Sequence, residues 1–253
     1  MQYRFTPKEN YYLVQITDCH LLQSADGYYQ QVQPAKHLAA IIRQLRKEQP
    51  DAVILTGDLT QDHSEASYRL LAEIMQGLTC PVFVTPGNHD DETMLSQLCV
   101  APPFRIEQSL QLQGWQLVLL NTKGATPAGV FPGTQQQWLA QQCRDSTQAN
   151  IWLFCHHHPV PLNCFIDKHG QQDQTALWRS IMTEPRIRGI AHGHAHHAYQ
   201  RQEQGVTVVG CPASSVQFLP QPHWQTVNEG PQWCDWFFSA EGDVSWQFRR
   251  LYE

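Results

Sequence analysis

The stretch YYLVQITDCH, residues 11–20, opens a pattern that recurs through the first half of the chain. Its first seven residues are rich in aromatic and β-branched side chains, which is typical of a buried strand. Asp18 and His20 follow at the end of this run. Because side chains two positions apart in an extended chain point the same way, these two side chains can hold a single ion.

Helical segments and further apolar runs follow this stretch in alternation. Residues 34–49 carry apolar side chains at helical spacing, and residues 52–56 (AVILT) have the pattern of a strand. Residues 64–76 favour a second helix with Ser64 as its N-cap, and residues 81–85 (PVFVT) favour a third strand. Such strand–helix alternation predicts an α/β fold in which helices pack over a sheet.

The second half of the chain repeats this theme more loosely. We expect three further strands and two helices, at residues 115–120, 150–155 and 187–191 and at residues 134–142 and 175–184. Residues 206–210 and 244–249 favour antiparallel strands. Residues 218–231 contain three prolines and predict a long surface loop, a kind of segment that is often functional. No linker interrupts the pattern, so we expect a single domain over residues 1–253.

The composition excludes several classes of protein. Hydrophobic residues make up 42% and charged residues 16%, as in ordinary globular chains. The formal net charge of −6 argues against binding a nucleic acid polymer, although bound metal ions can still attract a small anion. No apolar run approaches the length of about 18 residues that predicts a membrane span. Eight scattered cysteines without a CxxC pair favour reduced thiols, and we expect a cytoplasmic protein.

Polar residues gather just past the expected strands, where α/β sheets usually place their ligands. The segments after the first strand are Gly57-Asp58, Gly87-Asn88-His89-Asp90, His156-His157-His158 and His192-Gly193-His194-Ala195-His196. Taken singly, each segment is compatible with an ordinary turn or helix cap. Their joint occurrence at the ends of strands predicts a metal site, since histidine and carboxylate side chains are common metal ligands.

The order Asp-x-His, Gly-Asp, Gly-Asn-His-Asp, His and Gly-His-x-His resembles that of the calcineurin-like metallophosphoesterase superfamily. The segments LTGDLTQD (residues 55–62), HHHPVP (156–161) and PASSVQF (212–218) also resemble the bacterial class III 3′,5′-cyclic AMP phosphodiesterases. This resemblance covers essentially the whole chain. It implies a four-layer αββα sandwich with mixed sheets, a monomer, and two divalent ions bridged by one carboxylate.

The resemblance also implies which residues hold the two ions. The first ion would be held by Asp18, His20, Asp58 and His196, and the second by Asp58, Asn88, His157 and His194. His157 is chosen because the family ligand precedes a His-Pro pair, and His156 is the alternative within the triplet. Such mixed nitrogen and oxygen ligands suit Fe²⁺ and Mn²⁺, with Zn²⁺ as a further candidate.

The chemistry that follows from the resemblance is hydrolysis of 3′,5′-cyclic AMP to 5′-AMP. A hydroxide shared by the ions would attack phosphorus, and His89, oriented by Asp90, would protonate the leaving alkoxide. The residues expected to contact the cyclic nucleotide are His20, Asn88, His89, His158 and His196.

Two alternatives to this function stay open. The first is a broad-specificity phosphodiesterase or phosphomonoesterase, because the same ligands act on many phosphate esters. The second is a non-catalytic interaction module, which the retention of every expected ligand disfavours. Cys19, where Thr or Ser is common, and the loop with Gly27-Tyr28-Tyr29 depart from close relatives, so the base preference is open.

Overall fold

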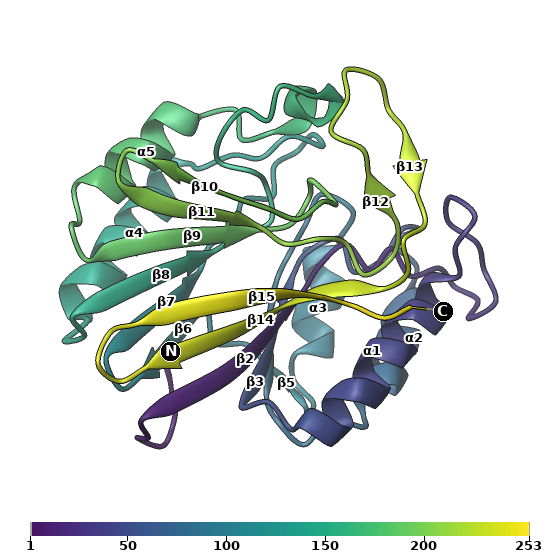
Figure 1. Ribbon diagram of the computed structural model, residues 1–253, viewed down its shortest axis with the longest axis horizontal. Helices are drawn as coiled ribbons and strands as arrows, with labels where there is room; N and C mark the ends of the chain where they lie inside the picture. Colours follow the sequence, from purple (N-terminus) through teal and green to yellow (C-terminus); the bar gives the residue numbers. More distant parts are fainter. Residues whose placement is uncertain (1, 253) are drawn as a thin grey trace.

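The computed structural model of this protein describes residues 2–252. Two β-sheets pack face to face, and helices cover the outer face of each sheet (Figure 1). Both sheets contain parallel and antiparallel strand pairs. The layers therefore run helix, sheet, sheet, helix, and the predicted αββα sandwich with mixed sheets is confirmed.

The first sheet has six strands in the order β15-β14-β2-β3-β4-β5. These strands are β2 (Asn10–Ile16), β3 (Ala52–Thr56), β4 (Val82–Thr85), β5 (Phe104–Arg105), β14 (Gln232–Ser239) and β15 (Val244–Arg250). Strands β2 to β5 are parallel, and the hairpin of β14 and β15 joins them antiparallel beside β2. The outer face of this first sheet is covered by α1 (Pro34–Glu48), α2 (Glu65–Met75) and α3 (Glu92–Leu98).

The second sheet has seven strands in the order β1-β6-β7-β8-β9-β11-β10. These are β1 (Tyr3–Arg4), β6 (Ser109–Leu112), β7 (Trp115–Leu119), β8 (Asn150–Phe154), β9 (Ile187–His192), β10 (Tyr199–Glu203) and β11 (Val206–Gly210). Its outer face is covered by α4 (Gly133–Asp145) and α5 (Gln174–Met182). A 3₁₀ turn, η1 (Phe165–His169), and a small hairpin of β12 (Gln217–Phe218) and β13 (Thr226–Val227) lie outside both sheets.

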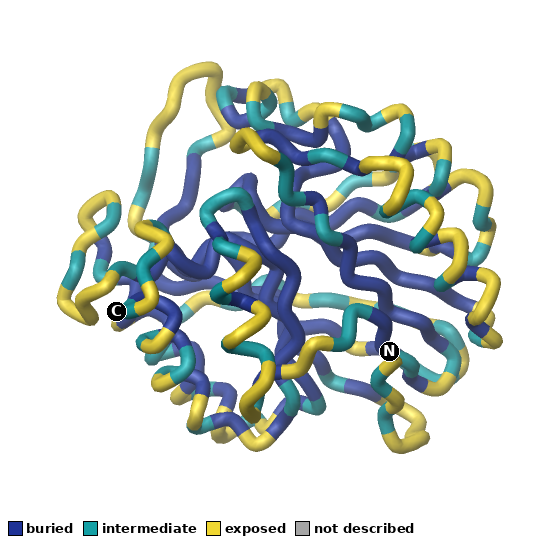
Figure 2. Tube along the Cα trace, turned by 180° about the vertical axis from the view of Figure 1, so that it is seen from behind, coloured by how far each residue is buried: buried dark blue, intermediate teal, exposed yellow. Residues whose placement is uncertain are grey.

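A core of aromatic side chains holds the two sheets together. The ring of Trp152 on β8 lies 5.2 Å from that of Trp236 on β14, at an angle of 61°. Phe154 lies 5.6 Å from the same Trp236 ring, again edge to face. Such pairs add to the stabilisation from buried area, so the two sheets behave as one packed unit. Figure 2 shows these strands as the most buried part of the chain, with exposed residues on the helices and outer loops.

Most long elements lie where the sequence predicts them. Helix α1 begins at Pro34, which suits a first helical position, and the Ser64 side chain caps α2 by accepting from the Ser67 N–H. The strand at residues 206–210, expected to be antiparallel, is so on one side only: β11 pairs antiparallel with β10 but parallel with β9. The loop expected at residues 218–231 contains the second strand of a hairpin.

Within residues 2–252, no helix is both long and apolar enough to span a membrane.

The carboxyl ends of strands from both sheets meet at one end of the sandwich. The Asp18 N–H after β2 donates to the Gly57 carbonyl after β3, at 3.0 Å. Within the second sheet, the Gly193 N–H after β9 donates to the His156 carbonyl after β8 at 3.0 Å. Between the sheets, the Ser214 N–H after β11 donates to the Thr17 carbonyl after β2 at 3.0 Å. These backbone bonds bring loops far apart in sequence into one cluster.

Candidate metal centre

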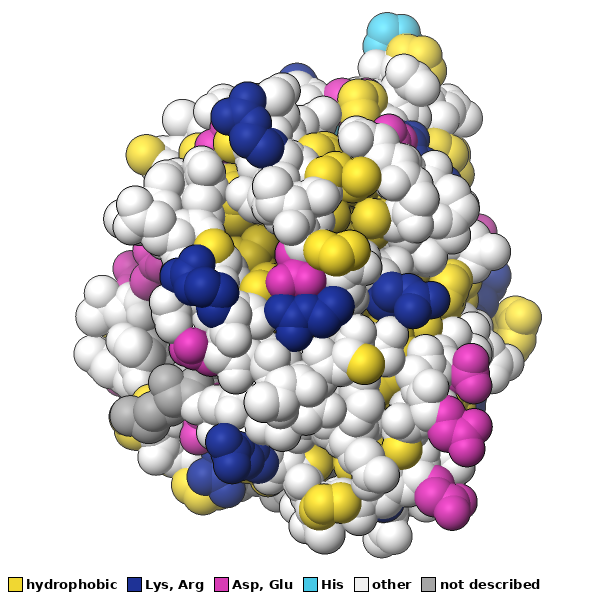
Figure 3. Space-filling view, turned by 90° about the vertical axis from the view of Figure 1, so that its left-hand side faces the viewer, with side chains coloured by type: hydrophobic (Ala, Val, Ile, Leu, Met, Phe, Trp, Pro, Cys, Tyr) yellow, Lys and Arg dark blue, Asp and Glu magenta, His cyan; other side chains and the backbone are white. Residues whose placement is uncertain are grey.

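The histidines of the sequence motifs lie inside the molecule, at the meeting point of these strand ends. His20, His156, His157, His194 and His196 are all buried, as are Asp18 and Asp58. Figure 3 views the side that is on the left in Figure 1, and histidine appears there only at the upper edge. Lys and Arg side chains on that face lie among acidic and neutral ones.

Four of the expected ligands form the first cluster. The Nε2 atom of His196 lies 3.2 Å from Oδ1 of Asp18 and 3.1 Å from Nε2 of His20. His20 Nε2 is 3.8 Å from Oδ2 of Asp58. Ligand atoms bound at about 2.1 Å on adjacent corners of one coordination sphere lie roughly 3 Å apart, so this spacing fits a single ion. The residues expected for the first ion are thus brought together.

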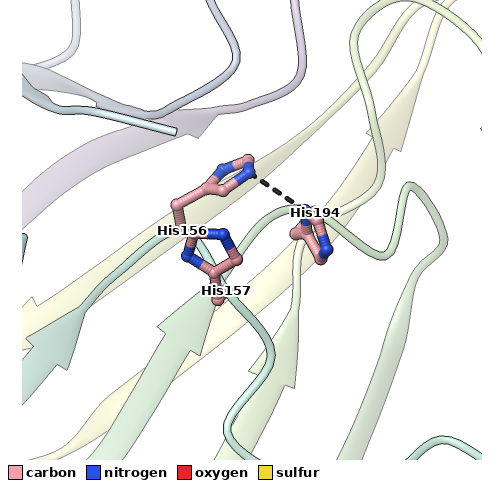
Figure 4. A group of neighbouring side chains, drawn as sticks. All are labelled: His156, His157 and His194. Atoms are coloured by element: carbon pink, nitrogen blue, oxygen red, sulfur yellow. Dashed lines mark hydrogen bonds between the residues drawn. The ribbon is translucent and has the colours of Figure 1, made fainter. Parts of the chain in front are cut away.

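A second cluster lies on the other side of Asp58. The Nε2 atom of His156 is 3.4 Å from Oδ1 of Asp58 and 3.1 Å from Oδ1 of Asn88. The same Nε2 atom is 3.2 Å from Nδ1 of His194 (Figure 4). Asp58 therefore offers one carboxylate oxygen to each cluster. This is the arrangement that a bridging carboxylate requires.

Two histidines of the triplet, His156 and His157, lie at the second cluster, and the one that approaches Asp58 is not the expected one. Both ring nitrogens of His157 have other neighbours, because Nδ1 lies 2.9 Å from the Thr122 hydroxyl and Nε2 lies 3.2 Å from the Pro127 carbonyl. The His157 ring lies beside those of His156 and His194 (Figure 4), but it is His156 whose Nε2 reaches Asp58. The structure thus favours the alternative member of the triplet.

The alternation of side chains along β8 explains this difference. Leu153 and Cys155 face the outer core under the helices, whereas Phe154 faces the core between the sheets. Continued past the end of the strand, this alternation turns His156 toward the other sheet and His157 away from it. Counting alternate side chains along the predicted strand would therefore have indicated from the sequence that His156, and not His157, faces the other sheet.

The remaining ring nitrogens of three histidines are held by oxygen atoms. Nδ1 lies 2.8 Å from the Thr56 carbonyl in His156, and 2.7 Å from the Val216 carbonyl in His196. In His20, Nδ1 lies 2.7 Å from Oε1 of Gln61. Metal-binding histidines usually donate their other N–H in this way, which fixes the ring and leaves Nε2 as the ligand atom. The donor set and its orientation therefore fit two divalent ions.

The buried charges of the protein groups balance one another. Burial raises the pKa of the Asp58 carboxyl, but His156 and His20 outweigh this effect and hold it well below its usual range. Burial lowers the pKa of His156, but Asp58 and Asp18 outweigh it and raise the pKa to about 9. Burial lowers the pKa of His20 to about 3. Without metal, Asp58 is thus ionised and His20 is neutral, whereas His156 carries a proton that a bound ion would displace.

The backbone at the ligands is strained. Asp18, His20 and Asp58 have φ angles of 52°, 48° and 51°, and those of His194 and His196 are 65° and 56°. Residues other than glycine seldom occupy this left-handed region, and such strain clusters at functional sites. Two glycines permit the close approach of the loops. A Cβ atom on Gly87 would lie 2.2 Å from Oδ1 of Asp58, and one on Gly193 would lie 1.9 Å from Oγ1 of Thr17.

Asp90 does not have the partner that the sequence suggested. Its buried carboxylate accepts from the Gly87 N–H at 2.9 Å, the Leu59 N–H at 3.1 Å and the Tyr68 hydroxyl at 3.2 Å. Burial raises its pKa to about 7. Among the described contacts, none joins Asp90 to the His89 ring. Asp90 thus ties the loops after β3 and β4 together, because backbone N–H groups already occupy its oxygens.

A cavity of about 330 Å³ opens onto the two clusters. Its lining includes His20, Asn88, His89 and His196, which are four of the five residues expected to contact substrate. The fifth, His158, lies outside this lining, and its Nε2 is 3.3 Å from Oδ1 of Asp167. The wall also contains residues that were not among the expected substrate contacts, namely Tyr29, Pro127, Phe165, Ile166, Lys168, His169, Phe218 and Trp224. They come from separate loops. The sequence had singled out the loop with Tyr29 and the loop at residues 218–231, but not the segment that contains Phe165, Ile166, Lys168 and His169.

Comparison with known proteins assigns this arrangement to a family. The family described as calcineurin-like phosphoesterase matches residues 11–198. The chain is 38% identical over 234 residues to a probable cyclic nucleotide phosphodiesterase of Pseudoalteromonas sp., with 90% of this chain and 88% of that protein covered. It is 31% identical over 245 residues to the 3′,5′-cyclic adenosine monophosphate phosphodiesterase CpdA of Vibrio vulnificus, with 94% and 89% covered.

A solved structure agrees at the level of the fold. A dimetal phosphatase from Danio rerio superposes with a TM-score of 0.68 at 16% identity, and the match covers 96% of this chain and 97% of that one. This likeness concerns the sandwich rather than the substrate. From the matched family and the similar relatives, we conclude that this chain belongs to the calcineurin-like phosphoesterase family.

Proposed function

We propose that this chain is a two-metal phosphodiesterase that hydrolyses 3′,5′-cyclic AMP to 5′-AMP. The observation that carries the proposal is the pair of ligand clusters that share Asp58 at the floor of one cavity. Relatives that cover most of the chain are named as cyclic nucleotide phosphodiesterases, which supports the substrate class. The hydrophobic core shared by the two sheets supports treating residues 1–253 as one domain.

In this proposal, the first ion is held by Asp18, His20, Asp58 and His196, and the second by Asp58, Asn88, His156 and His194. His156 replaces His157 for the geometric reason given above. Fe²⁺ or Mn²⁺ suits these nitrogen and oxygen donors. Bound there, two divalent ions would supply Lewis-acid stabilisation of phosphoryl oxygens and lower the pKa of water.

The side chains around the clusters orient the substrate and move a proton. His89 lines the cavity, and its ring lies edge-on to that of His20 at 5.3 Å. We assign it the role of protonating the leaving alkoxide. Its backbone N–H donates to Oδ1 of Asp58 at 2.7 Å, so this part of His89 positions the shared carboxylate. Asp90 acts through the loops that it joins rather than through the His89 ring.

Charge explains how an acidic chain attracts a phosphodiester. Asp18 and Asp58 contribute two negative charges, and two divalent ions contribute four positive ones, so the loaded centre carries about +2. Lys168 adds a further cation at the cavity wall. We also propose that the protein acts as a cytoplasmic monomer on a small cyclic nucleotide, without a nucleic acid or membrane partner.

Substrate comparison tests this proposal against a broad-specificity phosphoesterase. Purified protein is freed of metal with a chelator, reconstituted with Mn²⁺ or Fe²⁺, and given cyclic AMP or bis(4-nitrophenyl) phosphate. The proposal predicts 5′-AMP as the product, with a larger kcat/KM for cyclic AMP than for the aryl diester. Cleavage of the aryl diester without release of 5′-AMP would retain the metal chemistry and reject the cyclic nucleotide as substrate.

A further inference from the structure

We propose that Trp224 and Phe165 form a stacking site for the nucleobase at the mouth of the cavity. This inference rests on the proposed function, because it assigns the base-binding part of the same site. The polar floor of the cavity contains the ligand clusters, whereas its rim contains aromatic side chains. A nucleotide has the same two parts, since its phosphate is charged and its base is a flat aromatic ring.

The exposure of Trp224 is the first observation behind this proposal. Trp224 is 51% exposed and lines the cavity, whereas the chain's other seven tryptophans are buried or partly buried. Its one described ring contact is the edge contact with Phe218, with the ring centroids 6.4 Å apart at 79°. An indole in this position presents large apolar faces to whatever enters the cavity. Indole faces are good stacking surfaces for flat rings.

A chain of aromatic contacts links Trp224 to the metal centre. The Phe218 ring lies parallel to the His196 ring, with the centroids 3.7 Å apart at an angle of 4°. Phe165 meets Phe218 at 5.3 Å and 63°. Phe218 is therefore a support whose face is already covered by His196. Phe165 and Trp224 flank it at the rim, within reach of a ligand whose phosphate lies near His196.

The two rim elements are joined to each other through the backbone. The Phe165 N–H on η1 donates to the Gln221 carbonyl in the β12–β13 hairpin, at 2.9 Å. Within that hairpin, the Leu219 N–H donates to the Gln225 carbonyl at 3.0 Å. Figure 1 shows the hairpin standing away from both sheets. This bond joins the hairpin to η1, and Trp224 and Phe165 from these two elements line the same cavity.

The cavity volume and the strength of stacking agree with this assignment. A volume of about 330 Å³ falls at the lower end of the range for small-molecule sites. Removal of one aromatic side chain that stacks on a base weakens binding by roughly ten-fold. Such stacking would distinguish nucleotides from phosphodiesters without a base, because the floor of the cavity recognises only the phosphate.

The test compares two substrates that share the reacting group. Cyclic AMP is compared with the 3′,5′-cyclic phosphate of 1-deoxyribose, which lacks the base. We expect Trp224→Ala to lower kcat/KM for cyclic AMP by about ten-fold and to leave that for the base-free substrate within about two-fold. Trp224→Phe should retain most of the preference. His223→Ala alters an exposed neighbour outside the cavity lining and should change neither value.

The same variants separate this inference from the proposed function. An equal loss on both substrates, or no loss on cyclic AMP, would overturn the stacking site. If the wild-type protein turns over neither substrate, the proposed function fails, and calorimetric binding of 5′-AMP and ribose 5-phosphate decides the inference. Weaker binding of 5′-AMP alone by Trp224→Ala would support the stacking site, and unchanged binding would overturn it. Thermal unfolding of each variant confirms that it is folded.

Discussion

His156 and His157 are adjacent in the chain, but their rings have different neighbours. His156 Nε2 faces Asp58 and Asn88, whereas the ring nitrogens of His157 face Thr122 and Pro127. We therefore expect His156→Ala to lower both the second ion's occupancy and kcat/KM by more than about a hundred-fold. His157→Ala should cost about ten-fold, as for residues that support a ligand. Metal analysis and kinetics of both variants measure this, and the opposite order would restore His157 as the ligand.

His89 permits a separation of proton transfer from metal binding. Its ring lines the cavity, but it is its backbone N–H that contacts Asp58. His89→Ala should therefore lower kcat by roughly 10²–10⁴-fold while two ions stay bound. His63→Ala is the matched control, since His63 stacks beside His89 at 6.0 Å without lining the cavity. Loss of both ions from His89→Ala would remove His89 from this role.

For single residues, the sequence predicted which side chains form the site better than it predicted their hydrogen-bond partners. The motifs indicated Asp18, Asp58 and the histidines after β9, and the structure brings these side chains together. The sequence did not reveal that Asp90 would accept from backbone N–H groups. A hydrogen-bond partner depends on where the loops after β3 and β4 lie, and a motif does not encode that position. For the same reason, the sequence indicated the loop at residues 218–231 but not which of its side chains line the cavity.

The turn after β4 depends on the absence of a side chain at Gly87. A Cβ atom there would lie 2.2 Å from Oδ1 of Asp58, so Gly87→Ala must displace the shared carboxylate. We expect this variant to bind metal at least ten-fold more weakly and to unfold at a lower temperature. Gly133→Ala at the start of α4 is the control, because nothing lies within 4 Å of its added Cβ. Unchanged metal affinity in Gly87→Ala, measured by titration, would contradict the predicted crowding.

The connection from α5 to β9 provides a test that depends on pH. Hydrogen bonds from Arg186 at 2.8 and 2.7 Å lower the pKa of Glu184 below its ordinary value of 4.5. The stabilisation from a lowered carboxyl pKa is present above pH 4.5 and is lost as the pH falls through the folded-state value.

Glu184→Gln should therefore lower the free energy of unfolding by about 1 kcal/mol at neutral pH, and by progressively less in acid. Denaturant unfolding of both proteins across this range measures the difference. A difference that stays constant as the pH falls below 4.5 would show that the ion pair does not stabilise this connection.

Among the elements, long periodic segments were predicted and short ones were not. Helix α1 and strand β3 carry clear apolar patterns and lie within two residues of their expected bounds. Strands β1 and β5 have two residues each, which is too few for a periodic signal. The place of β14 beside β2 also has no local signal, because it joins the two ends of the chain.

The whole molecule positions the metal centre at the seam between its two sheets. Asp18, Asp58 and Asn88 follow strands of the first sheet, whereas His156 and His194 follow strands of the second. The aromatic core between the sheets therefore fixes the distance between the two halves of each ligand set. The family resemblance predicted this four-layer arrangement. Periodicity alone predicted only helices over a sheet, because it does not specify how two sheets face each other.

The central claim is that two ions sharing Asp58 hydrolyse a cyclic nucleotide. The most direct measurement adds Mn²⁺ stepwise to metal-free protein and follows bound metal and 5′-AMP release from cyclic AMP together. We predict two bound ions per chain, activity that rises as the second site fills, and neither full occupancy nor turnover in Asp58→Asn. Full activity in metal-free protein, in protein with a single bound ion or in Asp58→Asn would contradict the account. Two bound ions without release of 5′-AMP from cyclic AMP would also contradict it.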